Sequence, residues 1–448
     1  MKKSISRRTL LAAATSAAAF TIVPRHVLGQ GQTPPSEKVT LAGVGVGGQG
    51  AGDLEALAGA GAQIVALCDA DRRRSAETFQ KYPDAMPFRD YREMLDKIDK
   101  EIDAVLVATP DHTHAVIAAD ALKRKKHVYC EKPLAHSVWE VRELVRLAKQ
   151  NKVVTQLGNQ GHSSGDIRRF CEWVWDGAVG SVHTIHAGCS ANNSRLPDLP
   201  DLSEKHEVPP ELDWDLWLGP VPFRPYHPAY LPGKWRAWMP FGTGTIGDWT
   251  CHVIDPAFWA LDLGAPATVK CEAKDYDPKA HADTFPRGNR LTYTFPAKGK
   301  RGPVTLHWFD GIEKIPRPDV LEPDRKSVET GAVVFGDKGT IMHGSHGAGG
   351  VRIIPESAMR EYQPRMPKAT IPRTKGHQRD FIDAIREGHP AGSDFSYGGP
   401  LTEIALLGVI ATRCLGEELR WDAQKMRFTN SEKANQFVKP VFRDGWHL

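Results

Sequence analysis

Two side chains of this sequence stand at a spacing that suits proton transfer. Asp248 and His252 are four residues apart, in a segment that begins with small residues and becomes apolar towards Leu263. Residues four apart share one face of a helix, so the carboxylate and the imidazole would be neighbours. Histidine suits general base catalysis because its pKa lies near working pH. The same pair is also typical of a helix cap or an ion pair, so the spacing alone leaves both interpretations open.

A lysine follows a short apolar run elsewhere in the chain. Lys132 lies in Cys130-Glu131-Lys132-Pro133-Leu134, directly after the predicted strand 127–130. An ammonium group can hold a hydroxyl and stabilise the alkoxide that develops from it. Most lysines are solvated surface residues, but a position at the end of a buried strand favours a role in a site.

A glycine-rich turn joins the apolar run 38–44 to an Ala/Leu-rich helical stretch. Its residues are Gly45, Val46, Gly47, Gly48, Gln49 and Gly50. The pattern predicts a dinucleotide site: Gly45 makes the turn, Gly47 lets the backbone approach a pyrophosphate, and Gly50 lets the helix pack closely on the strand. Asp69 ends the next predicted strand, 63–68, where a carboxylate would bind the ribose hydroxyls of NAD. Arg72, Arg73 and Arg74 follow and could accept the extra phosphate, so NADP remains an alternative.

The elements that position these residues alternate between strand and helix. Strands are predicted at 38–44, 63–68, 102–108, 127–130 and 153–157, with helices at 115–125 and 138–150. Such alternation predicts a doubly wound parallel sheet, a Rossmann domain of residues 38–160. Ligands of these sheets bind outside the carboxyl ends of the strands, where Thr109, Pro110, Glu131 and Lys132 lie.

In these motifs the sequence resembles the Gfo/Idh/MocA oxidoreductases. The similarity rests on the glycine turn, Thr109-Pro110 with His114 nearby, the Glu131-Lys132-Pro133 tripeptide and the Asp-x-x-x-His segment, and it extends over most of residues 38–440. The resemblance implies that Lys132 lies beside the nicotinamide, that Pro133 follows a cis peptide, that His252 is the general base and that Asp248 orients it or holds substrate. It also implies NAD(P)-dependent oxidation of a sugar or polyol hydroxyl. The alternative is a glycoside hydrolase or lyase that uses NAD transiently.

The remaining residues, 161–448, predict an α+β domain that binds substrate. Strand-like runs at 181–187, 267–272, 290–295, 304–309, 332–335 and 339–343 indicate an open, mostly antiparallel sheet, and amphipathic helices are predicted at 376–385 and 401–415. A segment dense in Trp, Tyr and Pro follows residue 211; its flat rings suit a carbohydrate, although such rings also pin loops or fill oligomer interfaces. Candidate substrate contacts are Asn159, His162, Tyr226, Trp235 and Arg236.

The composition bears on which binding partners are expected. Residues 1–29 hold five basic side chains and no acid, which accounts for the whole net charge of +4 and gives no support to a nucleic-acid surface. The seven cysteines contain no C-x-x-C pair, and H-E-x-x-H is absent, so we expect core cysteines and no metal site. We expect a homo-oligomer formed through the C-terminal sheet.

The N-terminus predicts export. Arg7-Arg8 is followed by an apolar run to Val23 that is too short to span a bilayer comfortably, the outline of a cleaved twin-arginine signal over residues 1–29. Residues 30–37 would be a linker. A folded, exported protein in the periplasm would carry its nucleotide with it, so we expect the cofactor to be held tightly. A basic leader on a cytoplasmic protein is the alternative.

Overall fold

Six short strands form a parallel sheet in the first part of the chain. The computed structural model describes residues 38–448, so the predicted signal (1–29) and linker (30–37) lie outside it. The strand order is β3-β2-β1-β4-β5-β6, and every pair is parallel. The strands are β1 (Val39–Val44), β2 (Ala62–Cys68), β3 (Met86–Phe88), β4 (Ala104–Val107), β5 (His127–Cys130) and β6 (Thr155–Leu157). The predicted Rossmann sheet is confirmed.

Helices connect these strands, and their ends follow local capping rules. They are α2 (Gln49–Gly59), α3 (Arg72–Lys81), α4 (Tyr91–Ile98), α5 (Asp111–Lys123) and α6 (Val138–Asn151). Asp71 and Asp90 cap α3 and α4 by accepting a backbone N–H two residues ahead, and Ser137 caps α6 through Glu140 N–H. Strand order reverses between β1 and β4, so a crevice opens at their carboxyl ends.

A second, nine-stranded sheet follows, in the order β13-β12-β11-β7-β10-β9-β8-β14-β15. Only β7 and β10 pair in parallel; the other pairs are antiparallel, as predicted. The strands are β7 (Val182–Cys189), β8 (Thr268–Glu272), β9 (Arg290–Phe295), β10 (Val304–Asp310), β11 (Gly331–Gly336), β12 (Thr340–Gly344), β13 (Arg352–Ile354), β14 (Glu418–Asp422) and β15 (Arg427–Phe428).

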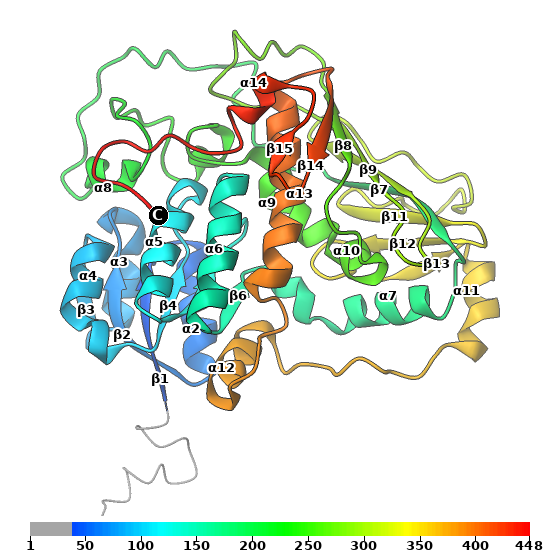
Figure 1. Ribbon diagram of the computed structural model, residues 1–448, viewed down its shortest axis with the longest axis horizontal. Helices are drawn as coiled ribbons and strands as arrows, with labels where there is room; N and C mark the ends of the chain where they lie inside the picture. Colours follow the sequence, from blue (N-terminus) through cyan, green and yellow to red (C-terminus); the bar gives the residue numbers. More distant parts are fainter. Residues whose placement is uncertain (1–37) are drawn as a thin grey trace, which may run out of the picture. The chain divides into compact units, whose positions relative to one another are not determined.

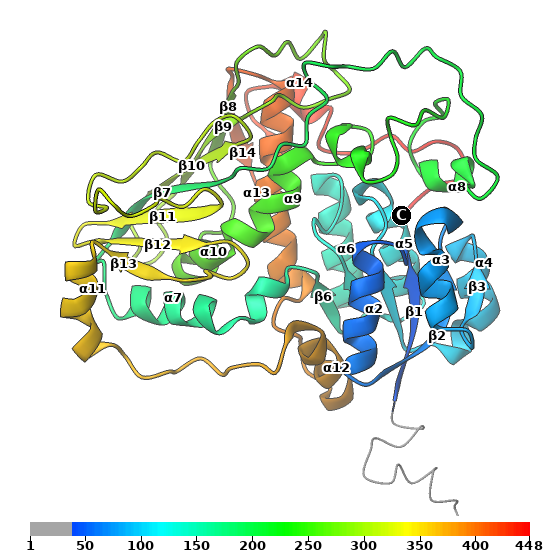
Figure 2. The same ribbon diagram turned by 180° about the vertical axis from the view of Figure 1, so that it is seen from behind.

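Helix α13 joins the two sheets. It packs against α6 of the first domain and against α9 and β8 of the second, and Figures 1 and 2 show it between the two sheets. The helices of this part are α7 (Gly165–Trp175), α8 (Trp214–Leu218), α9 (Gly244–Val253), α10 (Asp255–Leu261), α11 (Glu356–Tyr362), α12 (His377–Glu387), α13 (Phe395–Arg413) and α14 (Glu432–Asn435). None of the described helices is long and apolar enough to cross a membrane.

The chain after residue 160 is not confined to the second sheet. Helix α12 packs on α2 and β1 of the Rossmann sheet, and one apolar core holds residues of both sheets, such as Val105 and Ile185. All seven cysteines are buried and free, in keeping with the expected core role.

Residues between β7 and α9 form a long excursion with its own core. Only the five-residue α8 and a short 3-10 turn at Lys234–Ala237 are regular between residues 190 and 243. Eleven buried residues pack together in this segment, among them Trp214, Tyr226, Tyr230 and Trp238. We call this group the aromatic cluster.

Candidate active site

The glycine turn has the geometry of a nucleotide cradle. Gly45 has φ +78° and Gly48 φ +56°, values that other residues rarely adopt. A Cβ on Gly50 would lie 1.9 Å from the Gly45 carbonyl oxygen, and a Cβ on Gly45 would lie 2.6 Å from Thr109 N. The turn therefore packs directly on the start of α2 and on the end of β4. The N-terminus of α2 faces the crevice, where it would favour a pyrophosphate.

Asp69 directly follows β2 and fixes the glycine turn through a hydrogen bond. Its carboxylate accepts hydrogen bonds from Val46 N (2.9 Å) and Asp71 N (2.9 Å). Burial raises the pKa of Asp69 to about 6 despite these donors. The guanidinium of Arg74 lies against the turn, 2.7 Å from the position of a Cβ on Gly48. A carboxylate and an arginine thus face the place where a ribose and its phosphates would bind.

A large pocket runs along this crevice. Its lining includes Gly45, Gly47, Gly48 and Gln49 of the turn, Asp69, Thr109, Pro110, His114, Glu131 and Lys132. Of the residues predicted to contact cofactor, Val46 and Gly50 do not line the pocket; they shape the turn beneath it. The fit to a dinucleotide follows from the cradle and from the carboxylate at the end of β2.

The excursion between β7 and α9, which contains the aromatic cluster, covers this pocket from the other side. Leu216, Trp217, Leu231, Trp235 and Arg236 line it together with Trp446 near the C-terminus. Backbone hydrogen bonds hold the cover to the Rossmann domain, from Asp213 N to Ala70 O (2.8 Å) and from Arg72 N to Glu211 O (3.1 Å).

The C-terminal tail is attached to the same cover. Arg443 donates to the Gly219 carbonyl oxygen (2.6 Å), and the Arg92 guanidinium lies 4.6 Å from the centre of the Trp446 ring. The nucleotide pocket is therefore bounded by three stretches that are distant in the sequence.

Lys132 lies at a turn that two other groups fix. The Lys132–Pro133 peptide is cis, as the resemblance implied. The His114 ring contacts the carbonyl oxygens of Pro133 (2.8 Å) and Thr109 (2.7 Å) through its two nitrogens. His114 thus holds the ends of β4 and β5 in register. Its direct contact with a cofactor stays a prediction.

The Lys132 ammonium meets Asp248 across the crevice. Lys132 Nζ donates to Asp248 Oδ1 at 2.7 Å, and Arg236 Nε reaches the same oxygen at 3.3 Å. Burial disfavours a charged carboxylate, but the two cations outweigh it and hold the pKa of Asp248 below its usual range. Burial likewise opposes the charge on Lys132, yet Asp248 and Glu131 raise its pKa, so the ammonium persists at neutral pH.

His252 lies one helical turn beyond Asp248 on α9. It is buried, and its Nδ1 has no hydrogen-bond partner within residues 38–448. Burial, followed by the charge of Lys132 and by His346, lowers the pKa of His252 well below its usual range, so the ring is neutral at pH 7. The His346 ring stacks on it at 4.2 Å, and His346 N donates to the His252 carbonyl oxygen (3.0 Å).

A second, smaller pocket opens on these groups. It is lined by Gln49, Glu131, Lys132, Gln160, Asp248, Trp249, His252 and His346. Gln49, Glu131 and Lys132 also line the nucleotide pocket. Lys132 therefore stands at the junction of the two pockets, and Asp248 and His252 line the smaller pocket only.

Glu131 is a buried carboxyl beside this junction. Burial and the neighbouring Asp53 raise the pKa of Glu131 well above its usual value, and burial raises the pKa of Asp53 to about 6. One oxygen of each carboxyl, Glu131 Oε1 and Asp53 Oδ2, lacks a hydrogen-bond partner among the described residues. Lys132 Nζ forms its ion pair with Asp248, whereas burial and Asp53 favour the protonated form of Glu131.

Several candidate substrate contacts lie elsewhere. Asn159 and His162 are buried and bind the Asp255 carboxylate (3.1 Å each), and neither lines the nucleotide pocket or the smaller pocket. Tyr226 packs edge-on against Trp214 in the aromatic cluster. Trp235 and Arg236 line the nucleotide pocket, and Arg236 also binds Asp248, which lines the smaller pocket. The aromatic segment thus covers the nucleotide pocket instead of forming the smaller pocket.

Four residues of the site were not singled out from the sequence: Gln160, Trp249, Asn193 and His346. Trp249 and Gln160 adjoin predicted residues, so proximity to a motif could have indicated them. Asn193, whose amide donates to Asp248 Oδ2 (3.3 Å), and His346, in the loop after β12, carry no local signal.

Two family models match this chain. Residues 38–159 match the oxidoreductase family model with an NAD-binding Rossmann fold, and residues 200–301 match the C-terminal alpha/beta domain of the same family. The chain belongs to the Gfo/Idh/MocA oxidoreductase family. Its nucleotide is accordingly NAD, as the cradle and Asp69 indicate.

Two curated relatives each match 39% of this chain. Inositol 2-dehydrogenase 1 of Saccharopolyspora erythraea is 33% identical over 190 residues, which cover 39% of this chain and 52% of that protein. Inositol 2-dehydrogenase of Salmonella typhimurium is 28% identical over 180 residues, with 39% and 53% covered. The chain spans about half the length of these curated relatives.

Solved structures share the fold across most of the chain. An aldose-aldose oxidoreductase from Caulobacter crescentus, complexed with glycerol, superposes with a TM-score of 0.55 at 15% identity, covering 86% of this chain and 100% of that one. A levoglucosan dehydrogenase in complex with NADH gives 0.54 at 18%, covering 84% and 97%.

Proposed function

We propose that this oxidoreductase moves hydride between NAD and a hydroxyl-bearing carbon of a sugar or polyol. The observation that carries the proposal is the position of Lys132, which lines the nucleotide pocket and the smaller pocket that holds Asp248 and His252. A substrate hydroxyl in the smaller pocket would lie between an ammonium donor and a neutral imidazole. NAD, when bound, supplies the hydride acceptor.

Side chains of the smaller pocket carry out the other parts of the reaction. Lys132 donates a hydrogen bond to the substrate oxygen and stabilises the negative charge that develops on it. His252 accepts the hydroxyl proton, which its neutral ring can do at pH 7. Asp248 holds Lys132 at 2.7 Å and sets the position of the ammonium. The Trp249 ring and the Gln160 amide offer a face and a polar group to a carbohydrate.

The relatives support a polyhydroxylated substrate. Their names are those of dehydrogenases and oxidoreductases of inositol, levoglucosan and aldoses. A cyclic polyol or pyranose is therefore the class with which to begin.

The proposal is tested by a substrate screen and one variant. Sugars and cyclic polyols are offered to the protein with NAD, and keto products are identified by mass spectrometry. With the best substrate, stopped-flow absorbance at the reduced-nicotinamide band compares wild type with His252→Ala. We expect the variant to slow hydride transfer by about 100-fold or more. Transfer at the wild-type rate would refute the assignment of the base.

The covered nucleotide pocket supports a second candidate, a redox-neutral glycoside hydrolase or lyase. A nucleotide that stays bound must be reoxidised in place, and transient oxidation followed by elimination and re-reduction achieves this. Release of aglycone from a nitrophenyl glycoside without net nicotinamide reduction would favour this candidate. Net keto-sugar formation would favour the dehydrogenase.

We also propose that the protein is exported to the periplasm by the twin-arginine route. The support is the sequence of residues 1–29, with Arg7-Arg8 ahead of a short apolar run. Fractionation of cells that express the chain, with Arg7→Lys/Arg8→Lys as the comparison, tests this. Periplasmic wild type and a retained variant are expected; a cytoplasmic wild type would refute export.

A further inference from the structure

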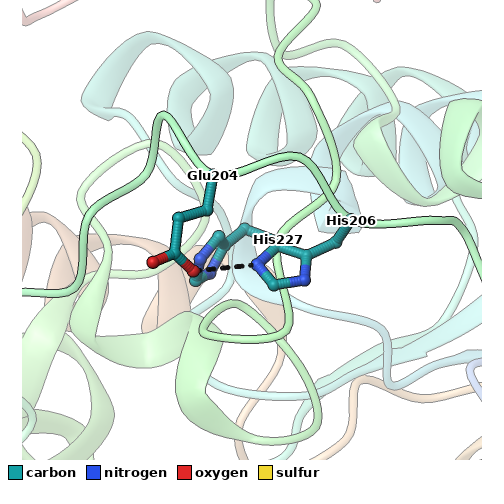
Figure 3. Close-up of side chains that lie close together, drawn as sticks. All are labelled: Glu204, His206 and His227. Atoms are coloured by element: carbon teal, nitrogen blue, oxygen red, sulfur yellow. Dashed lines mark ion pairs between the residues drawn. The ribbon is translucent and has the colours of Figure 1, made fainter.

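Three side chains in the excursion that covers the nucleotide pocket are of metal-ligating type. Glu204, His206 and His227 each offer one ligand atom, and these atoms lie within 4.8 Å of one another. Figure 3 shows the carboxylate and the two rings close together, with Glu204 and His206 on one stretch of chain and His227 on another. None of the three lines either pocket, so the cluster is distinct from the candidate active site.

His227 is the buried residue of the three, and one of its ring nitrogens has no hydrogen-bond partner among the described residues. Its side chain is 6% exposed. Nδ1 accepts a hydrogen bond from Ala229 N (3.0 Å), whereas Nε2 is buried and has no partner among residues 38–448. Nε2 is therefore the atom available to a ligand.

The distances approach those of a tetrahedral metal site. Zinc bonds of about 2.0–2.2 Å place neighbouring ligand atoms about 3.4 Å apart. His206 Nε2 and Glu204 Oε2 are already 3.5 Å apart. Both residues are exposed on irregular chain, so they can close on His227 by about 1 Å without moving a helix or strand.

Binding requires a proton shift on His227. A neutral ring that accepts at Nδ1 carries its proton on Nε2. The metal would take the Nε2 lone pair, the proton would move to Nδ1, and the hydrogen bond from Ala229 would be lost. This loss lowers the affinity but leaves the three ligands intact.

We propose that Glu204, His206 and His227 bind one Zn²⁺ ion, with water as the fourth ligand. Two imidazoles and one carboxylate suit zinc, whereas magnesium and calcium prefer all-oxygen sites. The His227 ring lies edge-on to the ring of Tyr230 in the aromatic cluster, with the two ring centres 6.1 Å apart. The ion would thus tie the irregular stretch around residues 204–206 to the core of the pocket cover.

Metal binding is measured on the untagged full chain after chelator treatment. Equilibrium dialysis against micromolar zinc, read by mass spectrometry of the metal, should give one equivalent for wild type. Co²⁺ in place of zinc should give the visible bands of a tetrahedral complex. His206→Gln and Glu204→Gln, both at exposed positions, should each weaken zinc binding at least tenfold. His183→Gln, an exposed histidine on β7, serves as the matched control and should bind as wild type does.

A second measurement, limited proteolysis, tests whether the ion holds residues 204–206 against the core of the pocket cover. Lys205 is exposed between two of the ligands, so trypsin should cleave after it. Zinc should slow this cleavage in wild type and in His183→Gln, but not in His206→Gln. Less than one bound equivalent, equal binding by His206→Gln, or cleavage unaffected by zinc would overturn the proposal. Both measurements are independent of catalysis, so they fail or succeed separately from the proposed dehydrogenase activity.

Discussion

At the scale of single residues, the site depends on one ionised carboxylate between two cations. Asp248→Asn keeps the size of the side chain but removes the charge that holds Lys132 and Arg236. The pKa of Lys132 should fall, and its ammonium should lose its fixed position. We expect kcat to fall about 100-fold, with the Kd for NADH, measured by fluorescence titration, within twofold of wild type. An equal loss of nucleotide affinity would show that Asp248 supports the pocket as a whole.

A second residue-scale prediction concerns a buried histidine outside the site. Burial lowers the pKa of His343, on β12, to about 4. An unfolded histidine titrates near 6.5, so below that pH the unfolded chain binds a proton that the folded chain does not. The free energy of unfolding therefore falls as pH drops from 6.5 towards 4, by about 2 kcal/mol at pH 5 for this one group.

Replacing that histidine isolates its contribution. His343→Gln should be less stable than wild type at pH 8, because it disturbs packing against Phe170. Since Gln does not titrate, the gap should narrow by about 2 kcal/mol between pH 8 and pH 5 in urea unfolding. A gap independent of pH would mean that His343 has the same pKa in the folded and the unfolded chain.

At the scale of elements, the sequence predicted what periodicity and turn chemistry encode. The β1–turn–α2 unit and strands β5 and β9 were predicted closely, because apolar runs and glycines mark them. β3, β13, β14 and β15 were missed; β3, β13 and β15 are only two or three residues long, and β3 contains Pro87. Their pairing depends on neighbouring strands, which no local pattern records.

The same distinction applies to the candidate site. Lys132, Asp248 and His252 were predicted from family motifs, and the structure brings them to one pocket. Arg236 was expected to contact substrate, yet it binds Asp248. His346 was not predicted because its role arises from stacking on His252, 94 positions away in the chain, and only tertiary packing creates that contact.

The glycine turn offers an element-scale prediction with a control in the same helix. Gly50→Ala places a Cβ 1.9 Å from the Gly45 carbonyl oxygen, so the turn must separate from α2. We expect a loss of about 3 kcal/mol in the free energy of unfolding and loss of NAD binding. Gly52→Ala, with no atom within 4 Å of its Cβ, should gain about 0.5–1 kcal/mol from helix propensity and bind NAD normally. If the two variants had the same free energy of unfolding and the same NAD affinity by calorimetric titration, the glycine turn would not be the nucleotide cradle.

At the scale of the whole molecule, the nucleotide pocket is lined by parts of the chain that are far apart in the sequence. The Rossmann turn forms its floor, whereas the aromatic excursion and the tail near Trp446 form its cover. A dinucleotide in this pocket would contact both floor and cover, so we expect contacts with the cover to act mainly on the rate of dissociation. A cofactor retained in this way is what the proposed export of the folded protein predicts.

Trp446 tests whether the cover retains the nucleotide. Its ring lines the pocket and rests on Arg92, and Arg443 separately anchors the tail to α8 through Asp215. Trp446→Ala should therefore leave the tail attached while opening one wall, and we expect NADH to dissociate about tenfold faster in stopped-flow displacement, with hydride transfer unchanged. Phe223→Ala removes a ring that is 71% exposed in the same cover but outside the pocket lining, so it should release NADH at the wild-type rate. Equal release rates for wild type and Trp446→Ala would show that the nucleotide is held by the floor alone, and a dehydrogenase that exchanges its cofactor freely would then fit the molecule better than one that keeps it.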